Sequence, residues 1–234
     1  MILMTQNELI IELNNLTANW LQDVDENCAQ HLTTDRLLIP IIACTTQGTT
    51  TKIAVLAKKA LNAAIKPEII VEVVLQLAPI VGILRVQQAL ECLQQCFDKE
   101  HIIYQRPTAE AHSNYGAQIQ AKLYGTEIKD LLKNLPDKAG EFIPTALTEH
   151  FFNDFYDRTL LSVAERERYE LMALITLNVE FQIKAHALGS LKAGNHVGEL
   201  VWSTIQLLPY IGFPQVINAV QLIQQAYQTL QNSK

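Results

Sequence analysis

One seven-residue pattern occurs twice in this chain and limits what the chain can fold into. The first copy is Gln76-Leu-Ala-Pro-Ile-Val-Gly82 and the second is Gln206-Leu-Leu-Pro-Tyr-Ile-Gly212. Corresponding residues lie 130 positions apart, and the same offset pairs many further residues without a gap. We therefore expect a helical unit that occurs twice and whose copies have diverged. Further pairs are Arg36 with Arg166, Ala43 with Ala173, Leu61 with Leu191 and Val71 with Val201.

The composition is typical of a globular chain that does not bind polyanions in general. Hydrophobic residues make up 49% of the 234 residues, and the formal net charge is −6 at pH 7. Binding to nucleic acid draws most of its affinity from clustered Lys and Arg, whereas the basic doublet here is Lys58-Lys59. We therefore expect no nucleic acid partner.

The sequence gives no sign of export or of insertion into a membrane. Residues 1–8 lack a basic region followed by a long apolar run. The longest apolar stretches are interrupted by Glu72, Gln76 or Pro209, so none predicts a membrane span. We expect no membrane partner and a cytoplasmic location.

Apolar residues recur at helical spacing, and no stretch shows convincing strand alternation, so the sequence predicts an all-α fold. A hydroxyl N-cap is expected at Thr33 or Thr34, and a proline in the first turn begins a helix at Pro67. The Ser162-x-x-Glu165 pattern predicts a capping box at another helix start. Expected helices include 6–22, 83–97, 116–135 with a break near 124–125, 144–156, 163–177, 180–193, 197–210 and 213–231.

We divide the chain into four parts on the basis of the repeat and its helices. These are an N-terminal helix over 1–24, a first repeat over 25–98, a connector over 99–115 and a second, more complete repeat over 116–234.

Four landmarks in the second half follow one another at characteristic distances. Residues 152–161 are rich in aromatic residues and contain Arg158, and residues 186–194 begin with His186. Glu199 follows near a helix start, and residues 210–214 read Tyr-Ile-Gly-Phe-Pro. Together these segments resemble the carboxymuconolactone decarboxylase family, strongly in the second half and more weakly in the first.

The resemblance implies an alkylhydroperoxidase-like fold, which is a duplicated antiparallel helical bundle in this chain. Family members with one repeat pair into dimers and assemble into rings. A chain with two repeats would imitate one dimer, so we expect a homo-oligomer, with a trimer favoured and a dimer as the alternative. The resemblance implies no cofactor.

The family contains a peroxidase branch whose chemistry does not fit this chain. That branch uses a C-x-x-C pair just before its histidine, and the corresponding residues here are Val179 and Gln182. The cysteines Cys28, Cys44, Cys92 and Cys96 form no such pair and are expected to be small core residues. A thiol peroxidase that uses Cys92 and Cys96 is the third-ranked alternative.

The decarboxylase branch removes carbon dioxide from a lactone carboxylate, after which the remaining electron density must be protonated. His186 stands at the family's histidine position and is the expected acid–base group. Glu199 is expected to orient or charge-stabilise the imidazole. Arg158 is expected to bind the substrate carboxylate, and Tyr210 to donate a hydrogen bond. Each of these residues also has a purely structural interpretation.

The chain departs from the family pattern at the second of two glutamates. That position is Trp202 in the second copy, whereas the first copy retains it as Glu72. A composite site of His186, Glu199 and Glu72 would follow if the copies face each other. The alternative is a non-catalytic or small-molecule-binding relative. We expect a small-molecule substrate if the protein is active, and no metal.

Overall fold

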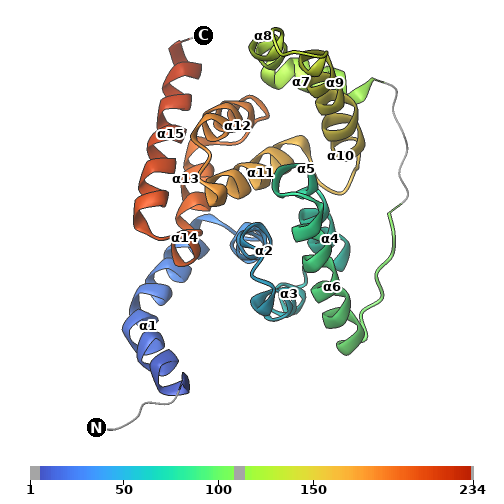
Figure 1. The fold of residues 1–234 in the computed structure, drawn as a ribbon. Coiled ribbons are helices and arrows are strands. Elements are labelled where there is room, and N and C mark those ends of the chain that lie inside the picture. The colour runs from blue at the N-terminus through green and yellow to red at the C-terminus, as the bar shows by residue number, and fades with distance from the viewer. Residues whose placement is uncertain (1–5, 108–113, 233–234) are drawn as a thin grey trace.

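The computed structural model describes residues 6–107 and 114–232 (Figure 1). All regular elements in these two ranges are helices, so the expected all-α fold is confirmed. The helices are α1 Gln6–His31, α2 Asp35–Gln47, η1 Thr50–Lys52, α3 Ile53–Asn62, α4 Pro67–Leu75, α5 Ala78–Val81, α6 Ile83–Lys99, α7 Tyr115–Tyr124, α8 Glu127–Leu132, α9 Ala139–Ala146, η2 Leu147–Asn153, α10 Asp154–Tyr156, α11 Val163–Leu177, α12 Glu180–Lys192, α13 Val197–Ile205, α14 Leu208–Ile211 and α15 Phe213–Asn232.

Most predicted helix starts agree with the structure, because local signals determine them. Pro67 is the first residue of α4, and the Ser162–Glu165 capping box begins α11. Of the two expected cap residues, Thr33 and Thr34, Thr34 stands at the N-cap position of α2, but it has helical backbone angles and its side chain makes no capping hydrogen bond. The helix α1 continues past the expected end at 22 and past the 24/25 boundary, because no glycine or proline interrupts it before His31. Part of the expected connector, 108–113, lies outside the described residues.

The helix limits keep the offset that the sequence pattern has. The helices α4 and α13 begin at Pro67 and Val197, and α5 and α14 begin at Ala78 and Leu208, which are again 130 positions apart. Positive φ angles recur with the same offset, at Gly48 and Asn178, Ala64 and Gly194, and Gly82 and Gly212. These coincidences support a duplicated unit.

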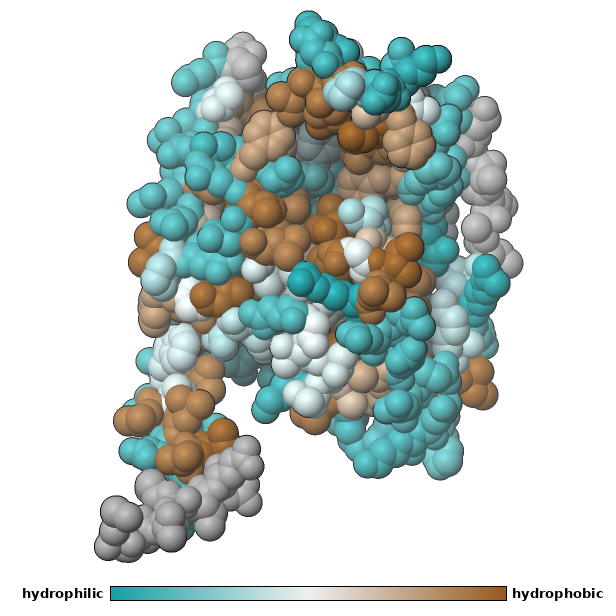
Figure 2. All heavy atoms as spheres, viewed as in Figure 1, coloured by the Kyte–Doolittle hydropathy of each residue, from teal (hydrophilic) through white to brown (hydrophobic). Residues whose placement is uncertain are grey.

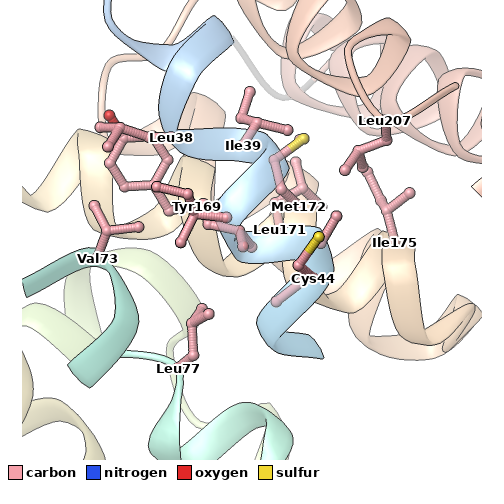
Figure 3. Packing of buried hydrophobic residues seen from close by; sticks show 14 of the residues in the cluster. Leu38, Ile39, Cys44, Val73, Leu77, Tyr169, Leu171, Met172, Ile175 and Leu207 are labelled. Carbon is pink, nitrogen blue, oxygen red and sulfur yellow. The ribbon is translucent and has the colours of Figure 1, made fainter. Parts of the chain in front are cut away.

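The two halves share one hydrophobic core. The helices α2 and α11 lie against each other at its centre, and one continuous cluster of buried side chains includes residues of both (Figure 3). Figure 3 shows Leu38, Ile39 and Cys44 of α2 beside Tyr169, Leu171, Met172 and Ile175 of α11. A smaller cluster joins α7, η2 and α10 and contains Leu123, Phe151, Phe152 and Tyr156.

A buried ion network connects the two halves next to this core. Glu72 of α4 accepts hydrogen bonds from Arg158 Nη2 at 2.6 Å and from Arg166 Nη2 at 2.8 Å. The side chains of Arg166 and Glu72 are 0% and 1% exposed. Burial works to raise the pKa of Glu72, but the hydrogen bonds from both guanidinium groups hold it below its usual range.

The N-terminal part of α1 extends away from the other helices (Figure 1). Figure 2 shows hydrophobic residues along this extension. No helix in the described ranges combines the length and the apolar character that crossing a membrane would require. The large apolar residues that α1 exposes are Leu9, Ile10, Ile11, Leu13, Leu16 and Leu21.

Candidate functional site

His186 lies on α12, which packs against α11, α15 and α7. Its Nδ1 atom is 2.9 Å from the hydroxyl of Tyr124 on α7. The same atom is 3.5 Å from Glu167 Oε2 and 3.8 Å from Glu170 Oε2. The imidazole is mostly buried and has polar neighbours on its Nδ1 side from two different helices.

Glu167 and Glu170 are three residues apart on α11, so both side chains point from one face of that helix. Both are fully buried. The Tyr124 hydroxyl donates to Glu167, and the Tyr156 hydroxyl contacts Glu167 as well and lies 2.7 Å from Glu170 Oε2. Two tyrosines therefore supply hydrogen bonds to two carboxyl groups from which water is excluded.

Burial determines the charge state of this group. It raises the pKa of Glu170 well above its usual range, and the neighbouring charge of Glu167 adds to the rise. Glu170 is therefore the neutral member of the pair. Burial likewise raises the pKa values of Tyr124 and Tyr156, so both hydroxyls keep their protons.

These contacts order a chain of hydrogen bonds that starts at the imidazole. Because the Tyr124 hydroxyl donates its proton to Glu167, its oxygen is free to accept a hydrogen bond from Nδ1–H of His186. The other ring nitrogen, Nε2, forms no hydrogen bond with the described residues. With Nδ1 protonated, Nε2 is the basic atom that can exchange a proton with a ligand.

A glycine makes room for this arrangement. Gly189 lies on α12 one turn after His186, and a Cβ atom at this position would be 2.6 Å from the Tyr124 hydroxyl oxygen and 2.9 Å from Glu167 Oε2. Only a residue without a side chain lets both groups approach the helix so closely.

A cavity of about 430 Å³ borders His186. Most of its wall is apolar, and Figure 2 shows hydrophobic residues around a recess below α8 and α9. Pro79 and Ile80 of α5 contribute to the wall from the first half of the chain. Glu127, the polar residues Gln120 and Gln182, and Tyr124 and His186 also line it, and the described lining includes no Arg or Lys.

The structure places the predicted site residues in separate surroundings. Glu199 Oε1 lies 3.1 Å from Arg168 Nη1, whereas the carboxylates within 4 Å of His186 in the described ranges are Glu167 and Glu170. Arg158 and Glu72 bind each other in the buried ion network. Tyr210 lines a different cavity, next to α1 and α2. The composite group of His186, Glu199 and Glu72 is thus not brought together, and the roles of these residues stay predictions.

The sequence interpretation did not single out Tyr124, Tyr156, Glu167 or Glu170. The sequence held one signal for the glutamates. Charged residues over 165–168 and at Glu170 belong to a helix whose following residues are apolar, so some of these charges had to be buried with that helix. Tyr156 lies in the aromatic-rich segment 152–161, but nothing in that segment marks it as a partner of the two glutamates, and Tyr124 gave no local signal.

Glu167, Glu170 and His186 also have ligand types that divalent metals accept. One oxygen or nitrogen atom of each lies within 4.8 Å of the others. Among the described residues, this trio is the candidate metal site, so the prediction of no metal is tested by measuring metal binding there.

The cysteine environments do not favour thiol chemistry. Burial raises the pKa of Cys28 to about 11 and also raises the pKa values of Cys44 and Cys96. Cys96 Sγ lies 3.5 Å from the carbonyl oxygen of Ala54. Thiols with raised pKa values are poor nucleophiles toward peroxide at neutral pH.

Comparisons with known proteins add no family to this geometry. Neither the protein-family models nor the curated proteins that were searched match the chain.

Proposed function

We propose that this protein is an enzyme of the carboxymuconolactone decarboxylase type, which uses His186 for cofactor-free acid–base chemistry on a small cyclic molecule. The observation that carries the proposal is the position of His186 between a cavity and a buried hydrogen-bond chain. Tyr124 and Glu167 order the imidazole through Nδ1, and the cavity that His186 lines offers space for a ligand beside the ring.

The lining of the cavity favours a substrate with a largely apolar body. A volume of about 430 Å³ is sufficient for a small ring compound. Because the described lining includes no Arg or Lys, a substrate carboxylate would have to lie against a protonated His186. This differs from the expected role of Arg158, whose guanidinium is bound to Glu72.

The proposed step moves one proton. The C–C bond to the carboxylate breaks, carbon dioxide leaves, and its bonding electron pair stays on the ring as an enolate. Nε2 of His186 gives its proton to the ring carbon, and the imidazole regains a proton from solvent. The carboxylate of Glu167, through Tyr124, stabilises the imidazolium before the transfer.

The proposal can be tested without knowing the substrate, by measuring how much deuterium from D₂O the protein transfers to carbon. The protein is incubated in D₂O with small unsaturated lactones, with and without a carboxylate, and carbon-bound deuterium and released carbon dioxide are measured by NMR. We expect incorporation with the wild-type protein and none with His186→Gln, while circular dichroism shows an unchanged fold. Equal incorporation by both proteins would contradict the proposal.

A non-catalytic, small-molecule-binding protein is the second candidate, and the apolar cavity favours it as well. It would bind lactones in the same NMR samples, as seen by saturation transfer to ligand protons, without exchanging their protons for deuterium. His186→Gln would then change affinity but no rate.

We further propose that the protein forms a homo-oligomer with a second and a third copy of itself. The support is the apolar surface that α1 exposes, where Leu16 has 76% of its surface accessible. Light scattering after size exclusion should give a mass near three chains, and Leu13→Glu with Leu16→Glu should reduce it. A monomer at all concentrations would contradict this part of the proposal.

A further inference from the structure

A second cavity of about 340 Å³ lies between α1, α2, α3 and α14. It occupies the position in the first half that the His186 cavity occupies in the second. Leu56 lines it where the 130-residue offset would place His186, and Pro209 and Tyr210 line it where the other cavity has Pro79 and Ile80. The positions that match Glu167 and Glu170 are Leu37 and Pro40, so the acid–base group is absent here.

This second cavity has cationic side chains instead of an acid–base group. Arg36 and Lys59 line it together with Asp25. Arg36 Nη1 is 3.4 Å from Asp25 Oδ1, and Lys59 Nζ is 3.8 Å from the same oxygen. Two positive charges thus share one carboxylate at distances too long for strong ion pairs.

The contrast between Arg36 and its counterpart Arg166 explains why a positive charge faces this cavity. Arg166 is fully buried and binds Glu72, but the position that matches Glu72 in the other half is Trp202. Arg36 therefore lacks a buried carboxylate partner, and its side chain is 29% exposed. Most of its five N–H donors remain available to a ligand.

The lining also has polar groups that can hold a second part of a ligand. Gln206 is only 5% exposed, and its Oε1 atom has no hydrogen-bond partner among the described residues. A buried acceptor without a partner is costly, so a donor on a ligand would stabilise it. Burial raises the pKa of Tyr210, which keeps its hydroxyl protonated and able to donate.

We propose that this second cavity binds a small organic monoanion with an apolar body and a hydroxyl group. Its carboxylate binds Arg36 and Lys59, its body contacts Leu37, Leu56 and Pro209, and its hydroxyl donates to Gln206 Oε1. The absence of the acid–base group makes this a binding site and not a catalytic one. It is independent of the function proposed for the His186 cavity.

The test is isothermal titration calorimetry with the probe 4-hydroxyphenylacetate on the full chain. Phenylacetate, which lacks the hydroxyl, and 2-(4-hydroxyphenyl)ethanol, which lacks the carboxylate, are the matched probes. We expect 4-hydroxyphenylacetate to bind about tenfold more tightly than either, since each loses one polar contact. The affinity should fall as ionic strength rises.

Variants of each cavity show which of the two cavities binds 4-hydroxyphenylacetate. Arg36→Gln and Lys59→Gln should each weaken binding about tenfold or more, and Leu56→Trp should abolish it by filling the cavity. Lys58→Gln is the matched control, because Lys58 lies on the same helix but binds Glu100 at 2.7 Å outside the cavity. Ile128→Trp, which fills the His186 cavity instead, should leave binding unchanged.

Several results would overturn the proposal. They are no binding of 4-hydroxyphenylacetate at millimolar concentration, equal affinity in Arg36→Gln and Lys59→Gln, or loss of binding in Ile128→Trp but not in Leu56→Trp. Lys59→Gln changes an exposed side chain and keeps the test valid if Arg36→Gln fails to fold. Loss of deuterium exchange in His186→Gln bears only on the other cavity.

Discussion

Tyr124 lies against Gly189, and the missing side chain of the glycine is what gives the tyrosine hydroxyl its place beside His186. A Cβ atom on Gly189 would come within 2.6 Å of that hydroxyl oxygen. We expect Gly189→Ala to displace Tyr124, to lower proton transfer to a small fraction and to destabilise the fold by about 1–3 kcal/mol. Gly198→Ala is the control, because nothing lies within 4 Å of a Cβ there. Deuterium incorporation and thermal unfolding measure both effects, and equal behaviour of the two variants would contradict the close contact.

Removal of the Tyr124 hydroxyl alone should separate orientation from binding. Tyr124→Phe keeps the ring but breaks the contact of the hydroxyl with His186 Nδ1. We expect the exchange rate to fall about 10–100-fold, since an unoriented base loses much of its efficiency, while ligand affinity changes little. Tyr227→Phe on α15 serves as the control. An unchanged rate in Tyr124→Phe would remove this hydroxyl from the mechanism.

Glu170 should make stability depend on pH in an unusual direction. Its pKa is raised in the folded protein, so the folded state holds a proton that the unfolded state has lost. The free energy of unfolding should therefore decrease as pH rises above about 4.3, the ordinary glutamate value, with a slope of up to about 1.4 kcal/mol per pH unit until the folded pKa is passed. Glu170→Gln should remove this slope. Urea unfolding of both proteins between pH 5 and 8 gives the difference, and parallel curves would contradict the assignment of the proton.

Loss of Glu72 should be far more costly than loss of a surface carboxylate. Glu72→Ala leaves the buried guanidinium of Arg166 without its carboxylate, which we expect to destabilise the fold by about 3–5 kcal/mol. Glu100→Ala removes the partly exposed partner of Lys58 and should leave stability nearly unchanged. Thermal or urea unfolding compares the two. A small effect of Glu72→Ala would show that Arg166 finds another partner.

The trio of Glu167, Glu170 and His186 should function without a metal. We expect the purified protein to contain less than stoichiometric metal by mass spectrometry, and EDTA to leave deuterium exchange unchanged. The reason is that the two tyrosine hydroxyls already contact both oxygens of Glu167 and Oε2 of Glu170, which leaves only Glu170 Oε1 without a hydrogen-bond partner among the described residues. Stoichiometric metal that is lost in Glu167→Gln would contradict the prediction.

The sequence predicted the parts of the fold that depend on neighbouring residues. The capping box at Ser162 and the proline at Pro67 act within one helical turn, so their helices begin where the pattern places them. The expected single helix over 197–210 is wrong, because α13 ends at Ile205 and Pro209 lies in the first turn of the separate helix α14. Gly82 and Gly212 have positive φ and end the short helices before them. The absence of a breaker near residue 24 also determined the length of α1, although the prediction ended this helix too early.

The candidate site was only partly accessible from the sequence. The resemblance identified His186, and the structure places it beside a cavity. Its partners could not be derived, because Tyr124 is 62 residues away and meets the imidazole only through the packing of α7 on α12. Glu199 was expected near His186 but lies beside Arg168, since spacing alone does not tell which neighbour a helix face meets.

Each of the two cavities is lined in part by residues from the opposite half of the chain. Pro79 and Ile80 close the cavity of the second half, and Pro209 and Tyr210 close that of the first. Under the two proposals made above, a mutation in α5 that improves binding in one cavity therefore alters a short helix whose counterpart, α14, lines the other cavity. If both cavities bind ligands as proposed, residues of α5 and α14 should covary with the lining of the opposite cavity among related sequences.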